Sequence, residues 1–103
     1  MIMNKKTMEE AEHLFRAILK LQTLEECQAF FDDLCTIKEI QDMSQRLDVA
    51  MMLDAGKNYQ EVSRATGAST ATICRVNKCL NYGSSGYRTV LDRINTPKET
   101  SND

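Results

Sequence analysis

Three stretches of apolar residues at helical spacing fill the first half of the chain, at 7–21, 23–35 and 36–56. Each begins with a threonine followed three residues later by a glutamate, the pattern of a capping box at a helix N-terminus. The three pairs are Thr7–Glu10, Thr23–Glu26 and Thr36–Glu39. We therefore predict three consecutive helices, the third and longest ending at Gly56, and expect residues 1–6 to be disordered.

A fourth stretch, 57–81, predicts two short helices joined by a tight turn. Asn58 can cap the first helix, and Gly67 can end it because glycine takes a positive φ without steric cost. Ser69 or Thr70 can cap the second helix. The first helix has a small apolar face made by Val62 and Ala65. The second has an apolar stripe made by Ile73, Val76 and Leu80.

The opposite face of the second helix is polar and basic. Short hydroxyl and methyl side chains at a helix N-terminus, followed by basic residues, suit close approach to a DNA major groove. We predict contacts to base edges by Thr70, Ala71 and Thr72. We predict contacts to the DNA backbone by Lys57, Ser69, Arg75 and Lys78. Two alternatives to a DNA contact remain for Arg75: it could line a ligand pocket, or it could simply lie on the surface. Lys57 and Lys78 could likewise be solvated surface residues.

The segment 82–86 predicts a turn, and a last helix should follow it and end at Pro97. Its apolar positions are Tyr87, Val90, Leu91 and Ile94. We expect residues 96–103 to form a disordered tail, which leaves a single helical domain over 7–95.

The length and composition limit the possible classes of protein. The 103 residues are enough for one domain, and 42% hydrophobic with 27% charged residues is ordinary for a globular protein. No apolar run approaches the roughly 20 residues that a membrane span needs. The N-terminus lacks the apolar core of a secretion signal, so we expect a cytoplasmic protein without membrane contact.

The charge is unevenly distributed along the chain. The net charge is −2, and residues 1–56 hold six basic against eleven acidic residues. Residues 57–81 hold four basic residues against the single acidic residue Glu61. An acidic body with one basic segment fits a DNA reader that does not bind polyanions indiscriminately.

Catalytic and metal chemistry find little support in the sequence. The four cysteines form no C-x-x-C pair, and His13 has no neighbouring serine, aspartate or cysteine partner. The cysteines are Cys27, Cys35, Cys74 and Cys79. We therefore expect no metal, no cofactor and no enzyme activity.

The first two predicted helices look too apolar and too narrow to bury themselves within one chain. Their larger apolar side chains could instead complete the core of a partner, which makes an intertwined homodimer the expected state. These side chains are Phe15, Phe30, Phe31 and Leu34. A compact monomer with the same residues inside is the alternative.

The run from Thr36 to Asn81 resembles the tryptophan repressor superfamily. The resemblance is closest at Gln45-Arg46, at Gly67-Ala68, and at Ala71-Thr72-Ile73 followed by Arg75. The wider pattern over about 8–95 is similar to the YerC/YecD branch. The resemblance implies an all-α domain of about six helices with a central helix-turn-helix and a homodimer intertwined through its N-terminal helices. It also implies regulation of transcription by binding to a double-stranded DNA operator, with repression as the expected mode.

The resemblance also implies roles for individual residues. The positions that would touch phosphates at the start of the first hairpin helix are Asn58, Tyr59 and Gln60. The positions that would line an effector pocket are Thr36, Arg46, Arg75 and Val76. The family's repressor has glycine where this chain has Val76, so we expect that tryptophan is not the effector. Another small anion stays possible, and the effector is unknown.

Two functions of different classes are compatible with the sequence. The first is a sequence-specific DNA-binding regulator, and the alternative is a protein-protein interaction module that reuses the helix pair, for which the acidic body would suit a basic partner. Arg46 has a structural alternative as well, because Asp42 lies four residues before it and can pair with it on a helix. A salt titration separates the two functions, since DNA binding weakens steeply as salt rises.

Overall fold

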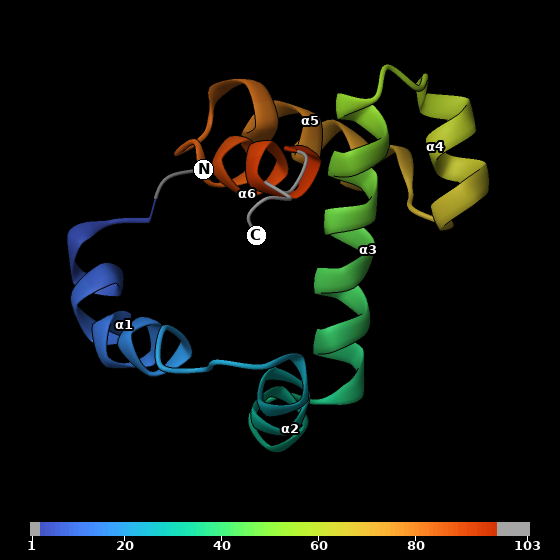
Figure 1. Cartoon of the computed structure of the whole chain (residues 1–103). Coiled ribbons are helices and arrows are strands. Elements are labelled where there is room, and N and C mark those ends of the chain that lie inside the picture. The colour runs from blue at the N-terminus through green and yellow to red at the C-terminus, as the bar shows by residue number, and fades with distance from the viewer. Residues whose placement is uncertain (1–2, 97–103) are drawn as a thin grey trace. The chain divides into compact units, whose positions relative to one another are not determined.

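A computed structural model describes residues 3–96, which contain six helices and no strand, so the prediction of an all-α fold is confirmed. Figure 1 shows the helices in chain order. They are α1 (Lys5–Ile18), α2 (Leu24–Leu34), α3 (Ile37–Asp54), α4 (Tyr59–Thr66), α5 (Thr70–Tyr82) and α6 (Gly86–Asn95). The described residues form two compact units, 3–43 and 44–96, and α3 begins in the first unit and ends in the second.

Local hydrogen bonds explain where α2 and α3 begin. The Thr23 hydroxyl accepts from the backbone N–H of Glu26 at 3.0 Å. Thr36 and Glu39 form the complete predicted box, in which each side chain accepts from the other residue's N–H, at 3.1 and 2.8 Å. These bonds span only three residues, so the sequence alone was enough to predict them.

The predicted start of α1 at Thr7 is wrong. The helix begins at Lys5, and the Asn4 side chain accepts from the Thr7 backbone N–H at 2.8 Å. Asparagine caps a helix as well as threonine does, so an earlier competent cap lets the helix begin sooner. Lys5 and Lys6, which we expected to be disordered, therefore belong to α1.

The N-terminal unit leaves much of its apolar surface uncovered. No residue of α1 or α2 is buried in the single chain. The large apolar side chains that stay exposed in α1, in α2 and in the segment between them are Met8, Phe15, Leu19, Leu24 and Leu34. Phe30 and Phe31 are half-buried and meet edge to face, with ring centroids 5.7 Å apart. The single chain therefore does not supply these two helices with a core.

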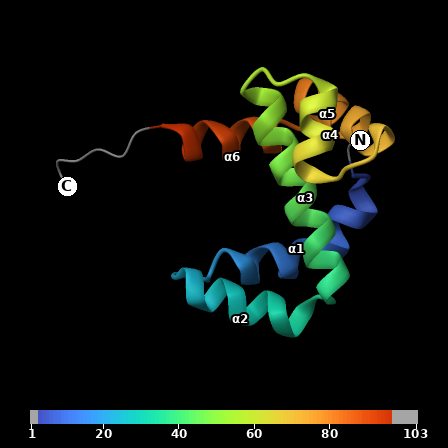
Figure 2. The same cartoon turned by 90° about the vertical axis from the view of Figure 1, so that its right-hand side faces the viewer.

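The unit 44–96 has a small, closed core to which every helix of the unit contributes. Figure 2 shows α5 in the group formed by α4, α6 and the end of α3, and α5 contacts both α4 and α6. The buried side chains are Val49, Ala50, Val62, Ala68, Ile73, Val76 and Leu91. Ala65, which we predicted on the apolar face of α4, is exposed. Ala68 is buried in its place, because the turn after α4 carries that residue into the core.

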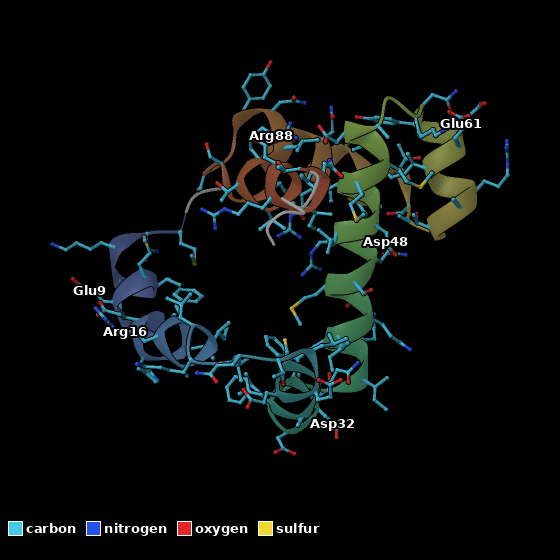
Figure 3. All side chains as sticks on the ribbon, in the orientation of Figure 1. Glu9, Arg16, Asp32, Asp48, Glu61 and Arg88 are labelled. Carbon is cyan, nitrogen blue, oxygen red and sulfur yellow. The ribbon has the colours of Figure 1, made fainter. Side chains whose placement is uncertain are left out.

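An ion pair joins α6 to the end of α3 in this unit. The Arg88 guanidinium donates to the Asp54 carboxylate at 2.9 Å and to Asp92 at 3.0 Å, and Figure 3 labels Arg88 on α6. The hydrogen bond to Asp54 raises the pKa of Arg88 further, although desolvation opposes it. The pairing of Arg46 with Asp42 that the sequence allowed is not formed, since Asp42 accepts from Lys38 at 3.0 Å instead.

Within residues 3–96, no helix combines the length and the hydropathy needed to cross a membrane. The same residues bring no three histidine, cysteine or acidic side chains together as ligands for a metal ion. Pro97, which we expected to end the last helix, lies outside the described residues, and so does the expected tail after Thr96.

Candidate nucleic-acid interface

Helix α4 begins with a complete capping box. The Asn58 side chain accepts from the Glu61 backbone N–H, and the Glu61 carboxylate accepts from the Asn58 N–H, both at 2.9 Å. Figure 3 labels Glu61 at the start of α4. Asn58 was also predicted to touch a DNA phosphate, and its side-chain oxygen is already used by the cap. Its amide group, which donates no hydrogen bond to residues 3–96, remains for that role.

Two features fix the turn between α4 and α5: the positive φ of the glycine at its start, and four hydrogen bonds. Gly67 ends α4 with φ of 75°, as predicted. The Thr66 hydroxyl accepts from the Ala68 N–H at 3.1 Å and donates to the Val62 carbonyl at 2.7 Å. The Ser63 hydroxyl donates to the Ala68 carbonyl at 3.0 Å, and Gln45 of α3 donates to the Thr66 carbonyl at 3.1 Å. The angle between the two helices therefore does not depend on Gly67 alone.

Helix α5 begins after Ser69, whose hydroxyl accepts from the Thr72 backbone N–H at 3.1 Å. The Ser69 hydroxyl also donates to the Thr72 hydroxyl at 3.1 Å. Thr70 and Ala71 are exposed, while Thr72 is half-buried. Of the three predicted base-contact residues, two therefore face solvent freely, and the hydroxyl of Thr72 keeps a lone pair for a further partner.

Tyr59 connects α4 to α5. Its hydroxyl lies within hydrogen-bonding reach of Cys74 and Asn77 on α5. Desolvation raises the pKa of Tyr59, Cys74 raises it further, and the hydrogen bond to Asn77 opposes the shift. The phenol is thus neutral at physiological pH, and a phosphate contact by Tyr59, as we predicted, would use a hydroxyl that lies near Cys74 and Asn77.

The basic residues of the segment 57–81 are exposed and unpaired within the described part of the chain. They are Lys57, Arg64, Arg75 and Lys78. Of the other basic residues that the structure describes, Arg16, Lys38 and Arg88 pair with carboxylates, whereas Lys5, Lys6, Lys20, Arg46 and Arg93 do not. Arg64 was not among the predicted contacts. Its place four residues after Gln60, on the same helix face, was the signal in the sequence that would have suggested it.

The residues of the predicted effector pocket belong to both units. Thr36 is in the unit 3–43, where its hydroxyl caps α3. Arg46, Arg75 and Val76 are in the unit 44–96, so the structure describes the two parts of this pocket separately. Val76 is only 1% exposed and belongs to the core, as predicted from the apolar stripe of α5, whereas Arg46 is half-buried and Arg75 is exposed.

Comparison with known proteins agrees with this architecture. Residues 9–95 match the Trp repressor protein family. The uncharacterized protein YerC of Bacillus subtilis (strain 168) is 57% identical over 91 residues, which cover 88% of this chain and 85% of YerC.

Two solved structures share the fold. One is a candidate Trp repressor from Staphylococcus aureus, with a TM-score of 0.84 and 45% identity over 94% of this chain and 99% of that one. The other is a TrpR-like protein from Eubacterium eligens ATCC 27750, with a TM-score of 0.84 and 45% identity over 92% of this chain and all of that one. The chain therefore belongs to the Trp repressor family, and within it resembles YerC.

Proposed function

We propose that this protein is a sequence-specific DNA-binding regulator of transcription that acts as a homodimer, without tryptophan, through the helix-turn-helix α4–α5. The observation that supports the proposal most directly is the kind of side chain exposed on α5 and on the neighbouring helix α4. Short side chains lie at the N-terminus of α5, and exposed basic side chains without carboxylate partners among residues 3–96 lie farther along α5, on α4 and just before α4. This arrangement leaves the positive charge available to a polyanion.

In this proposal, residues in the first turn of α5 contact the DNA bases. Thr70 and Ala71 are exposed there, and the N-terminal residues of a recognition helix are those that reach base edges in the major groove. Arg75 and Lys78 follow on the exposed surface of α5, where they would hold the DNA backbone. The N-terminal side of α4 would add contacts from Lys57, Asn58, Tyr59 and Gln60, and Ser69 one from the turn.

The homodimer is supported by the N-terminal helices. No residue of α1 or α2 is buried, and Leu19 and Leu24 are 82% and 68% exposed. A second copy of the chain would cover this surface, and a two-fold axis would place two copies of α5 in successive major grooves, about 34 Å apart. The operator would then be a pseudo-palindrome.

Independence from tryptophan is supported by Val76. The side chain belongs to the closed core of the unit 44–96, where a glycine would leave space beside α5. We infer that the protein itself fills the position that an indole would need. The turn of the helix-turn-helix is also held by hydrogen bonds from α3, from α4 and within the turn, so no ligand is required to fix it.

Selection from a random-sequence DNA pool, followed by a salt titration of the selected duplex, tests the proposal. We expect enrichment of a pseudo-palindromic sequence and an affinity that falls steeply as salt rises, because bound phosphates release counterions. A protein that enriches no sequence and binds no duplex at low salt would refute this function and favour the protein-protein interaction module.

A further inference from the structure

Two hydrogen bonds link the side chain of Ser69, the N-cap of α5, to Thr72 in the first turn of that helix. The Ser69 hydroxyl accepts from the Thr72 backbone N–H at 3.1 Å. It also donates its own proton to the Thr72 hydroxyl oxygen, again at 3.1 Å. An oxygen that accepts one hydrogen bond donates a stronger one, so the two bonds support each other. Together they orient the Thr72 hydroxyl.

These two bonds decide which hydrogen-bonding groups of the pair remain free. A hydroxyl has one proton and two lone pairs, and Ser69 has used its proton on Thr72. The proton of the Thr72 hydroxyl makes no hydrogen bond within residues 3–96. A threonine in a helix often donates to the carbonyl four residues earlier, but here that carbonyl, of Ala68, accepts from Ser63 at 3.0 Å. Thr72 therefore keeps a proton to donate.

The unused proton matters once a partner excludes water from the start of α5. Thr72 is half-buried, and its neighbours Thr70 and Ala71 are exposed. A donor left without an acceptor in a desolvated contact is costly. The remaining lone pair of Thr72 is on an oxygen that already accepts one bond, so leaving it empty costs less. A partner atom that accepts a hydrogen bond should therefore be preferred here over one that donates.

We propose that Ser69 fixes the sense in which Thr72 reads a base, so that Thr72 donates to an acceptor on the base edge. The acceptors in the major groove are N7 and O6 of guanine, N7 of adenine and O4 of thymine, and the donors are the amino groups of adenine and cytosine. The proposal rests on the proposed function and adds Ser69 as a positioning residue. The Ser69 hydroxyl has no proton left for a phosphate, so a contact of Ser69 to the DNA backbone would use its backbone N–H.

The test uses the duplex selected by the wild-type protein and base analogues that change one major-groove atom at a time. Acceptors are removed or weakened with 7-deazapurines, with 2-aminopurine in place of guanine, and with 4-thiothymine. Donors are removed with purine in place of adenine and 2-pyrimidinone in place of cytosine. Fluorescence anisotropy gives the affinity of the wild type and of Thr72→Val, which replaces the hydroxyl by a methyl group. We expect loss of one acceptor to weaken the wild type about twofold to tenfold, as for one neutral hydrogen bond, and T72V to show no such loss.

Three further variants separate positioning from helix capping. Thr72→Ser keeps the hydroxyl and should keep the sensitivity to the missing acceptor. Ser69→Gly should bring that loss below about twofold, because the freed hydroxyl can turn its proton to another acceptor, while glycine still serves as an N-cap. The matched control is Thr23→Gly, which removes an equivalent capping hydroxyl at the start of α2 and should leave the sensitivity unchanged. Thermal melting monitored by circular dichroism confirms that each variant is folded.

The remaining outcomes distinguish this inference from the proposed function. A wild-type protein that selects no duplex overturns both together. Selection of a duplex with an equal response of the wild type and T72V to every analogue overturns the inference alone. A loss that depends on Thr72 but follows removal of an amino donor would show the opposite sense of reading and would also overturn it. Full sensitivity in S69G would overturn the positioning role of Ser69.

Discussion

Replacing Val76 by glycine tests how far α5 depends on the core of the unit 44–96. The valine side chain is 1% exposed and lies among the buried residues of that core. Burying a valine side chain stabilises a protein by roughly 1.5–3 kcal/mol. A glycine inside a helix costs about 1 kcal/mol relative to alanine. We therefore expect V76G to lower the free energy of unfolding by about 2.5–4 kcal/mol.

The matched control is Lys78→Gly, which places a glycine in the same helix at an exposed position. This variant should lose only the helix-propensity contribution, about 1 kcal/mol. Both free energies come from urea unfolding followed by circular dichroism at one fixed protein concentration, because the stability of a dimer depends on concentration. Equal losses for the two variants would refute the placement of Val76 in the core.

Three further predictions concern function. Thr72→Ala should relax preference at one operator position by roughly 1–3 kcal/mol, measured by competition between duplexes, whereas Lys78→Ala should weaken every duplex alike and make the salt dependence shallower. If both variants bind the operator like the wild type, these roles are wrong. Sedimentation at micromolar concentration should find a homodimer, and a folded monomer would contradict the role given to α1 and α2. Calorimetric titration with L-tryptophan should detect no binding, since extra methyl groups in a packed site cost about 1–3 kcal/mol. Micromolar affinity, or operator binding that rises with tryptophan, would show that Val76 leaves the site open.

The helices were predictable where their starting signals are local. The boxes at Thr36 and Asn58 involve atoms three residues apart, and the structure contains both. The same rule failed at Thr7 because two competent caps lie three residues apart there, and the rule does not say which one the chain uses. The helix begins after Asn4, the earlier of the two.

Features that depend on distant residues were less predictable. Ala65 and Ala68 are chemically identical, and only the path of the chain through the turn decides that the second is buried. Asp42 has a basic residue four positions away on each side, and its choice of Lys38 over Arg46 is not encoded in that spacing. Arg64 joins a polar surface only because the turn brings Thr70 beside α4, so the pattern of α5 alone does not reveal it.

The hydrogen bonds in the turn between α4 and α5 have a consequence for the thermodynamics of association. The Gln45 amide donates a hydrogen bond to the Thr66 carbonyl, and the Ser63 hydroxyl donates one to the Ala68 carbonyl. The turn is therefore ordered when the chain folds. The entropy of arranging this hairpin is then lost during folding and need not be lost again when a partner binds. The heat-capacity change on binding should accordingly correspond to the apolar area that the two surfaces cover as rigid bodies. It should not reach the larger value that is measured when a segment folds as it binds.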